Sequence, residues 1–271
     1  MLVKAFSCAV IGIGAIKISI EVHITQGIRF FIVGLADHAI RESQQRIEAA
    51  LSNNGFEWPR FRVVINLSPA HMRKEGTHYD LPLAIGILAA TRQVSESRLG
   101  DYLILGELSL DGGVRPVKGV LPMVLLAREE HFRGVIVPRD NATEASVVDG
   151  LDVIAVSDLT EVVSFLNGIP EENQREEKKR NFQADPGEYN VDFSEVKGQA
   201  AVKRAMLIAA AGSHNLILIG PPGSGKSMMA RRLATIMPPM SMEESLQTTR
   251  IYSVAGRVSS DSGLISVRPF R

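Results

Sequence analysis

The sequence predicts an α/β protein made of two domains joined by a charged linker. Strand-like and helix-like segments alternate over residues 1–168, and a highly charged stretch poor in apolar residues covers 169–190. An apolar run, a glycine-rich turn and a helical pattern then follow one another within 191–271. At 271 residues the chain is long enough for two domains of ordinary size.

The composition is that of a globular protein that can bury a sizeable core. Apolar residues make up 45% of the chain and charged residues 22%, and 30 basic side chains balance 30 acidic ones. This balance excludes a global field that attracts nucleic acid or an anionic membrane, although it allows a local basic patch. Cys8 is the single cysteine, which excludes a disulfide framework and fits the cytoplasm. The apolar stretches are too short to span a bilayer, so we expect no membrane partner.

The periodicity of the front domain predicts strands and helices in alternation. Alternating or β-branched runs indicate strands, and apolar residues at helical spacing indicate helices. The predicted strands are 15–24, 30–33, 61–67, 134–137 and 152–155, and the predicted helices are 37–51, 81–91, 120–130 and 158–166. Asp158 stands where an N-cap is expected, and Asn53, Asn54 and Gly55 are typical of a helix end.

Residues 1–16 admit two interpretations. Lys4 followed by an apolar run is the pattern of a signal peptide. Lys17 interrupts that run, and the turn Gly12-Ile13-Gly14 lies between β-branched residues. These features favour a strand, a turn and a second strand.

The charged stretch is the predicted linker because it carries too few apolar side chains to order itself. Its Lys178-Lys179-Arg180 run could contact phosphate, but the acidic neighbours favour a solvated linker. The second domain begins near Val191, with a predicted helix over 200–211 and a predicted strand over 216–219.

The second domain contains a complete phosphate-binding motif. Its residues match G-x-x-x-x-G-K-[ST] and are Gly220, Pro221, Pro222, Gly223, Ser224, Gly225, Lys226 and Ser227. The glycines allow backbone N–H groups to surround an anion, and the predicted helix after the loop adds its positive dipole. We expect Lys226 to reach the β- and γ-phosphates of ATP and the Ser227 hydroxyl to bind Mg²⁺. The alternative is a glycine-rich turn without a ligand.

Hydrolysis needs further groups that the sequence does not show. An acidic residue on a later strand and an arginine from a neighbour usually complete such a site. Glu243 and Glu244 follow Pro238 and Pro239 in a polar segment that predicts a solvated helix start. We therefore expect the nucleotide-binding domain to be truncated within 191–271, with weak ATP binding and negligible hydrolysis.

Five short motifs occur together in the second domain. They are FSEVKGQ at 193–199, the phosphate-binding motif at 220–227, IMPPMS at 236–241, SVAG at 253–256 and RPFR at 268–271. Together they resemble the magnesium-chelatase-like AAA+ proteins, specifically the ComM (YifB) subfamily. The resemblance covers nearly the whole chain, because the front domain is similar to that subfamily's Lon-protease-like N-terminal domain.

Two segments carry the likeness in the front domain. GELSLDGGVRPV at 106–117 resembles the Lon-type G-E-L-S-L-x-G-x-V-x-P-V segment, and KEGTHYDLP at 74–82 falls where Lon proteases carry their nucleophilic serine. The resemblance implies a ribosomal-S5-like two-layer α/β fold. It also places His78 at the serine position and Met123 at the lysine position, so the catalytic pair is missing. Ser109 is not at the nucleophile position, and we predict no Lon-type proteolysis.

A cluster of polar residues in the front domain could hold a metal ion. It contains His71, Glu75, His78 and Asp80, but the spacing fits no zinc signature. Solvated or hydrogen-bonded side chains are the interpretation that we favour.

A second cluster in the front domain combines arginine with aromatic residues. Arg60 and Arg62 beside Trp58 and Phe61 would suit phosphate contact and base stacking in single-stranded nucleic acid. The same alternation describes a strand with one solvated face, which we favour. The front domain is expected to be an interaction or nucleic-acid-contacting scaffold.

The resemblance implies that the complete protein is an ATP-driven ring motor on DNA. The resemblance to ComM-like proteins implies a branch-migration helicase in natural transformation, which acts as a homo-hexamer on single-stranded or branched DNA. ATP and Mg²⁺ are the expected cofactors. The alternatives are a chelatase-type chaperone that remodels a protein partner, an ATP-dependent protease, and a nucleotide-binding fragment without turnover.

Overall fold

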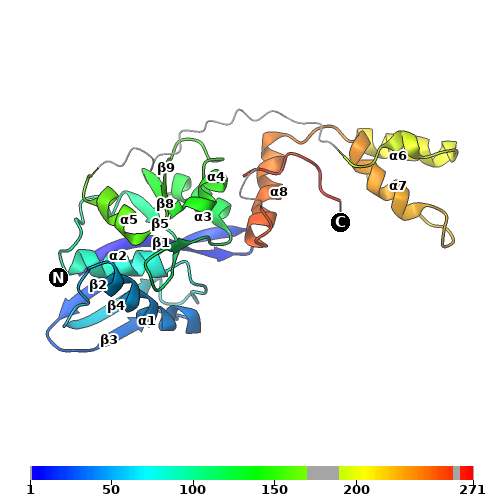
Figure 1. Ribbon diagram of the computed structural model, residues 1–271. Coiled ribbons are helices and arrows are strands. Elements are labelled where there is room, and N and C mark those ends of the chain that lie inside the picture. The colour runs from blue at the N-terminus through cyan, green and yellow to red at the C-terminus, as the bar shows by residue number, and fades with distance from the viewer. Residues whose placement is uncertain (1, 170–188, 259–262, 271) are drawn as a thin grey trace. The chain divides into compact units, whose positions relative to one another are not determined.

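The chain forms two compact units, which are seen in a computed structural model that describes residues 2–169, 189–258 and 263–270 (Figure 1). The first unit comprises Met1–Arg180 and Thr249–Gly263, and the second comprises Asn181–Thr248 and Leu264–Arg271. The predicted linker at 169–190 lies almost entirely outside the described residues, and so does its Lys178-Lys179-Arg180 run.

The first unit alternates strands and helices as the sequence predicts. In chain order its elements are β1 (Leu2–Ile11), β2 (Gly14–Thr25), β3 (Phe30–Val33), α1 (His38–Asn53), β4 (Arg62–Ser68), α2 (Asp80–Ala90), β5 (Tyr102–Ile104), β6 (Glu107–Leu108), β7 (Val114–Arg115), α3 (Val120–Glu129), β8 (Gly134–Pro138), the 3-10 turn η1 (Arg139–Asn141), α4 (Ala142–Ala145), β9 (Asp152–Val156) and α5 (Leu159–Leu166). The N-terminal strand, turn and strand are confirmed, and Asp158 caps α5 by accepting from the Glu161 amide at 2.9 Å.

Most strands of the first unit join one mixed sheet. The seven-stranded sheet has the order β3-β4-β2-β1-β5-β8-β9, in which β1 pairs antiparallel with β2 and β2 pairs antiparallel with β4. The remaining neighbours pair in parallel, and β6 and β7 form a separate hairpin. The mixed α/β class is thereby confirmed, whereas the ribosomal-S5-like arrangement stays a prediction.

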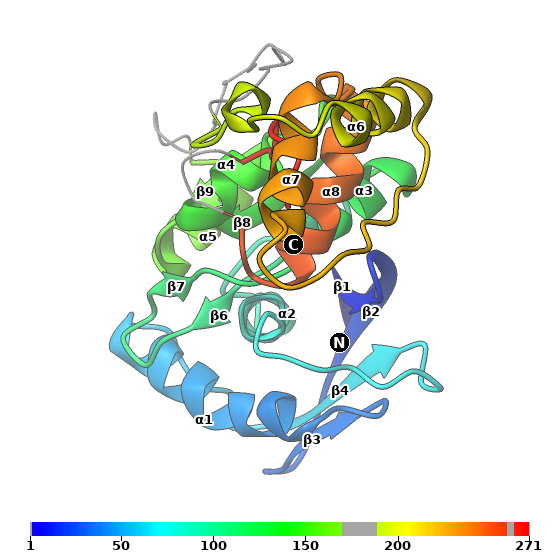
Figure 2. The same ribbon diagram turned by 90° about the vertical axis from the view of Figure 1, so that its right-hand side faces the viewer.

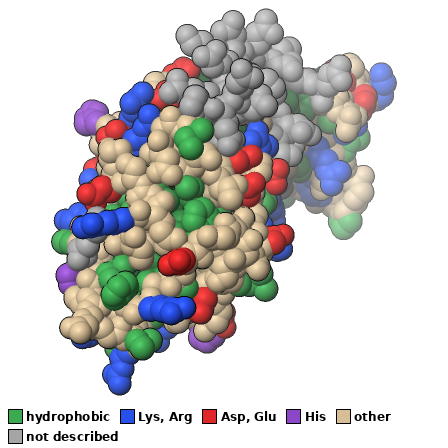
Figure 3. Space-filling view, turned by 60° about the vertical axis from the view of Figure 1, so that its left-hand side comes forward, with side chains coloured by type: hydrophobic (Ala, Val, Ile, Leu, Met, Phe, Trp, Pro, Cys, Tyr) green, Lys and Arg blue, Asp and Glu red, His purple; other side chains and the backbone are tan. Residues whose placement is uncertain are grey.

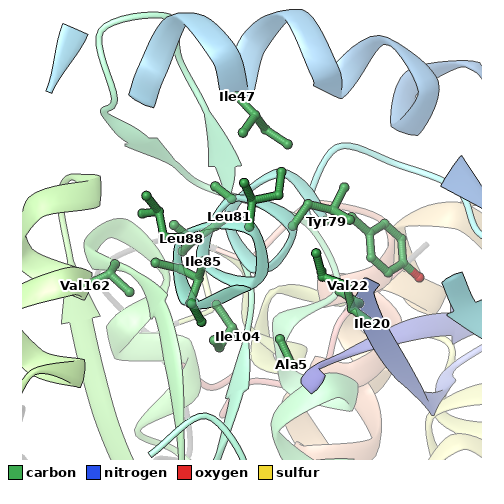
Figure 4. Packing of buried hydrophobic residues seen from close by; sticks show 14 of the residues in the cluster. Ala5, Ile20, Val22, Ile47, Tyr79, Leu81, Ile85, Leu88, Ile104 and Val162 are labelled. Atoms are coloured by element: carbon green, nitrogen blue, oxygen red, sulfur yellow. The ribbon is translucent and has the colours of Figure 1, made fainter. Parts of the chain in front are cut away.

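Helix α2 lies at the centre of the core of this unit. All of its residues are buried, and it contacts α1, β1, β2 and β6. Figure 2 shows α1 and α2 on the same side of strands β1 to β4, and Figure 4 shows Ile47 of α1 pointing toward Leu81 of α2. A helix that is apolar all round needs such neighbours on every side.

The one charged residue of α2 is neutralised inside the core. The carboxylate of Asp80 is fully buried and accepts two hydrogen bonds from the Arg46 guanidinium, at 2.7 and 2.9 Å. Burial raises the pKa of Asp80, and the guanidinium opposes this rise. Arg46 therefore joins α1 to the first turn of α2 by charge as well as by packing.

The second unit is smaller and mostly helical in its described residues. Its elements are the 3-10 turn η2 (Phe193–Glu195), α6 (Ala200–Gly212), α7 (Lys226–Leu233), the 3-10 turn η3 (Ala234–Ile236) and the first part of α8 (Met242–Val254), whose last part belongs to the first unit. The predicted helix at 200–211 is confirmed. The polar segment at Glu243 and Glu244 does begin a helix, as predicted.

The surface carries charges of both signs. Lys and Arg side chains and Asp and Glu side chains are both scattered over the face shown in Figure 3, with hydrophobic side chains among them. This agrees with the net charge of zero. Within the described ranges, no helix has both the length and the apolar character that crossing a bilayer would require.

We expect Ile47→Ala to lower the free energy of unfolding by about 3 kcal/mol, because Ile47 is fully buried and its loss opens a cavity between α1 and α2. Urea denaturation followed by circular dichroism measures the change. Gln45→Ala, at an exposed position of the same helix, is the control and should change stability by less than about 0.5 kcal/mol. Equal effects of the two substitutions would contradict the packing described here.

Candidate nucleotide-binding site

The phosphate-binding motif forms the turn that leads into α7. Gly223 and Gly225 have φ angles of +79° and +81°, which glycine adopts without the strain that a side chain would bring. Helix α7 begins at Lys226, and the N–H groups of a first helical turn have no acceptor within the helix. The turn therefore offers backbone donors and the positive end of a helix dipole at one place.

The ammonium group of Lys226 lies over this turn. Its Nζ donates to the carbonyl oxygens of Gly220 at 2.8 Å and Pro221 at 2.7 Å, and the Ser224 hydroxyl lies 3.3 Å away. The Ser227 side chain, at the next position of α7, is exposed. Lys226 is thus held beside the loop by neutral acceptors, which an anionic ligand can replace.

The prediction of a strand before the loop is wrong for the described residues. Residues 216–219 have no strand assignment, and the side chains of Ile217 and Ile219 are 79% and 87% exposed. Leu218 packs against the small core of Val196, Met206 and Met229. A covered side chain between two exposed ones is the burial pattern of a strand with one buried face. A strand also requires a neighbour for its N–H and C=O groups, and the described part of this unit supplies none.

The FSEVKGQ segment supports the loop and α7 from the N-terminal side. Glu195 pairs with Arg232 of α7, whose Nε also donates to the Asp192 carbonyl at 3.1 Å. The Gln199 amide donates to the Ser224 carbonyl at 3.4 Å. The sequence did not predict these contacts, since they join residues far apart in the chain without any periodic signal.

Glu244 serves the helix start of α8. It accepts from the Ser241 amide at 2.9 Å, while its own amide donates to the Ser241 hydroxyl at 3.2 Å, which is a capping box. Arg268 donates to both carboxylate oxygens of Glu244, at 3.0 and 2.9 Å. The Ser241 amide and then Arg268 lower the pKa of Glu244. The RPFR segment thus has a structural use at Arg268, and the carboxylate of Glu244 is engaged by Ser241 and Arg268.

In the first unit, the structure brings the two Lon-like segments side by side. The Leu81 amide donates to the Gly106 carbonyl at 3.0 Å, and the Gly106 amide donates to the His78 carbonyl at 3.1 Å. The hydroxyl of Thr77 also donates to the carboxylate of Glu107. Segments 74–82 and 106–117 therefore form one local structure around the start of α2.

The residues at the positions of the Lon catalytic pair are buried. The His78 ring is nine-tenths or more hidden from solvent, and its Nε2 lies 2.9 Å from the Cys8 carbonyl. Burial lowers the pKa of His78, which favours the neutral ring. Met123 is 1% exposed and has no group that could accept a proton from a nucleophile.

Ser109 lies in the turn of the β6–β7 hairpin. Its hydroxyl hydrogen bonds with the carboxylate of Asp111 and lies 3.0 Å from the Gly113 carbonyl. The amide of Ser109 donates to the same carbonyl at 2.9 Å. These contacts give Ser109 a role in holding the turn.

Lys74 is a buried cation that the sequence did not single out. Its Nζ donates to the carbonyls of Gly34 at 2.9 Å, Met72 at 2.7 Å and Pro69. Desolvation lowers the pKa of Lys74. The ammonium group joins the backbone at Gly34 to the loop that contains Pro69 and Met72, and no spacing in the sequence predicts this contact.

The polar cluster at 71–80 does not form a common site. Asp80 is taken by Arg46, His78 contacts the Cys8 carbonyl, and Glu75 pairs with Arg73 at 3.0 Å. Among the described residues, no three His, Cys, Asp or Glu side chains are placed to hold a metal ion.

Comparison with known proteins divides the chain between two family models. Residues 20–141 match the model described as subunit ChlI of Mg-chelatase, and residues 192–271 match the model described as magnesium chelatase, subunit ChlI. The second match includes the whole phosphate-binding motif.

Relatives match over almost the whole chain. An uncharacterized protein of Mycobacterium tuberculosis is 45% identical over 98% of this chain and 52% of its own length. Competence protein ComM of Haemophilus influenzae is 40% identical over 92% of this chain and 49% of its own length. YifB of Escherichia coli is 38% identical over 97% of this chain and 51% of its own length. The chain thus spans about half the length of the curated relatives it matches.

A more distant similarity concerns the front of the chain. Lon protease 2 of Bacillus subtilis is 26% identical over 49% of this chain and 24% of its own length. The resemblance seen in the sequence is therefore confirmed. The chain is a magnesium-chelatase ChlI-like AAA+ protein related to ComM and YifB, with a distantly Lon-like N-terminal part followed by a part that matches magnesium chelatase, subunit ChlI.

Proposed function

We propose that the chain binds ATP with Mg²⁺ through residues 220–227. The observation that carries this proposal is the glycine-rich turn with the Lys226 ammonium group held over it at the N-terminus of α7. Nucleotide binding is also what membership of the magnesium-chelatase AAA family implies.

In this proposal each group of the loop has a separate task. The backbone N–H groups surround the phosphates, and Lys226 exchanges its carbonyl acceptors for β- and γ-phosphate oxygens. A charged acceptor binds an ammonium group more strongly than a neutral carbonyl does, so the exchange is favourable. The Ser227 hydroxyl, which is exposed, would contribute to the shell of Mg²⁺.

We propose that the complete protein uses ATP to move DNA. Its relative of Haemophilus influenzae is named a competence protein, which supports a role in natural transformation. The proposed activity is that of a homo-hexameric branch-migration helicase in the cytoplasm, acting on single-stranded or branched DNA. The Lon-like front domain, of ribosomal-S5-like fold, would serve as an interaction or DNA-contacting scaffold.

The present chain is expected to bind ATP with negligible turnover. Hydrolysis needs an acidic group that orients water or Mg²⁺, and an arginine that stabilises the transition state. Glu244 and Arg268 are engaged with each other at the start of α8. The domain boundaries that we propose are 1–168 for the front domain, 169–190 for the linker and 191–271 for the nucleotide-binding part.

A chelatase-type chaperone is the second candidate. Both family models that match the chain are described by the ChlI subunit of magnesium chelatase, and this observation favours the candidate. The name of the Haemophilus influenzae relative, a competence protein, favours the DNA motor instead. Copurification of the complete protein with a tetrapyrrole-binding partner would favour the chaperone.

We expect Lys226→Ala to weaken the binding of Mg·ATP by about tenfold or more, because it removes the charged donor to the phosphates. Titration with a fluorescent ATP analogue measures binding, and a phosphate-release assay reports turnover. Arg204→Ala removes one exposed positive charge from α6 and should leave binding unchanged. Equal affinity of Lys226→Ala and the unaltered chain would contradict the assigned site.

For the complete protein we expect retardation of branched and single-stranded DNA in a gel, with a stronger effect when ATP is present. Phosphate contacts make such binding sensitive to salt, so the assay is run at low ionic strength. Absence of retardation of either DNA at low salt would count against the motor and leave nucleotide binding untouched.

We expect no cleavage of casein by the chain, because His78 and Met123 stand where Lon proteases have their catalytic pair. Ser109→Ala should not change this result, since the hydroxyl of Ser109 belongs to a turn. Fluorescence release from labelled casein is the measurement. Cleavage that disappears in Ser109→Ala would show that the front domain is a peptidase.

A further inference from the structure

Among the described residues, the outer face of the sheet, which is the face opposite α1 and α2, is covered at one end. Helix α3 contacts β1 and β2. Near the C-terminal end of α3, Phe6 packs edge-on against Phe132 with ring centroids 5.6 Å apart, and Lys17 pairs with Glu130. The other end of this face has no such cover among the described residues. There the side chains of Leu2 and Val33 are 56% and 47% exposed.

The strand register fixes which side chains share the uncovered end. His23 lies opposite both Leu2 and Val64, Phe31 lies beside Val64, and Arg62 lies opposite Thr25. Residues that pair directly, or that are two positions apart, point to the same side of a sheet. We call this surface the open face and define it by Leu2, His23, Phe31, Val33, Arg62 and Val64.

One side of the open face carries arginine over an aromatic ring. The guanidinium carbon of Arg62 lies 5.3 Å from the centroid of the Phe31 ring. The carbonyl of Arg29 accepts from the Val63 amide at 2.8 Å, which places Arg29 beside Arg62. The Phe31 side chain is itself 38% exposed.

The positive charge here is not neutralised by neighbours. None of the ion pairs found in the described part of the chain includes Arg29, Arg60 or Arg62. The nearby carboxylate of Glu21 is already engaged by Lys4 at 3.2 Å and by the Asn66 amide at 3.0 Å. Glu57 is exposed and lies close by in sequence.

Trp58 does not belong to this surface. Its ring lies against Phe30, with centroids 5.6 Å apart, and both side chains pack against the core. The arginine and aromatic cluster that the sequence suggested around Trp58 is therefore replaced by one around Phe31. Phe31 was absent from that cluster because it comes from another strand, and only the β3–β4 pairing brings it to Arg62.

We propose that the open face binds single-stranded nucleic acid, with Arg29 and Arg62 on the phosphates and an unpaired base stacked on Phe31. Exposed aromatic rings on a sheet beside unpaired arginines are the features by which single strands are bound without sequence preference. A duplex keeps its bases stacked inside and cannot use the ring. The proposal deepens the proposed function, on which it rests for the nucleic acid partner, by assigning the contact to one face of the front domain.

The test measures the fluorescence anisotropy of a labelled oligothymidylate with the 271-residue chain at low salt. The double substitution Arg29→Gln with Arg62→Gln should weaken binding about tenfold or more and reduce the dependence of affinity on salt. Phe31→Ala should weaken binding about fivefold or more through lost stacking. All three positions are exposed, so the fold should survive, and circular dichroism checks this.

The matched control is Arg41→Ala. Arg41 is an exposed arginine of α1, which covers the opposite side of the sheet, and its loss should leave binding unchanged. An oligoribonucleotide that binds as well as the DNA would support the proposal, since stacking and charge do not depend on the sugar. The proposal would be overturned if the chain bound no oligonucleotide at low salt, or if the double variant bound it as tightly as the unaltered chain. A duplex that binds more tightly than the single strand would overturn it as well.

Two further measurements separate this proposal from its alternatives. Sedimentation analysis would overturn it if the double variant abolished self-association of the chain while the chain bound no oligonucleotide, because the open face would then be a contact between copies. Calorimetry with Mg·ATP on the same samples reports on the loop at 220–227. The chain could bind the oligonucleotide but no Mg·ATP, while the double variant loses the oligonucleotide. That result would support the open face and contradict the proposed function.

Discussion

Every residue of helix α2 is buried, from Asp80 to Ala90, and such a helix is stable only with apolar neighbours on all sides. The first unit meets this requirement with β1 and β2 on one side and with α1 and β6 around the remainder. The charge of Asp80 at the start of the helix then requires a partner, which Arg46 supplies from α1. The two Lon-like segments border this helix start, so the same constraint holds them together and keeps His78 inside.

The candidate nucleotide-binding loop depends on a small core and on hydrogen bonds to its carbonyl groups. The small core beneath it contains three buried side chains, and Lys226 and Gln199 donate hydrogen bonds to carbonyl groups of the loop. Lys226 bonds to neutral carbonyls, so its position is preset while its charge stays available to phosphate. The glycines at 223 and 225 keep the turn in a conformation that exposes its amides.

Periodicity identified most of the fold, because long strands and amphipathic helices carry their pattern in consecutive residues. It missed β5, which has three residues, and the β6–β7 hairpin, whose strands have two each. It also predicted a strand at 216–219 from alternation alone, although a strand needs a hydrogen-bonded neighbour. The motif at 220–227 could be found from the sequence because its spacing is local. Arg46, Lys74 and Arg232 could not, since their partners come from other parts of the chain.

The position of Cys8 in the sheet, on the face that α3 covers, determines how its thiol reacts. It is the only cysteine, its side chain is fully hidden, and burial raises the pKa of its thiol well above the usual range. Alkylating reagents attack the thiolate and need access to sulfur, and Cys8 offers neither in the folded state. A cysteine introduced at any exposed position can therefore carry a fluorophore or spin label selectively, with the natural thiol left in place.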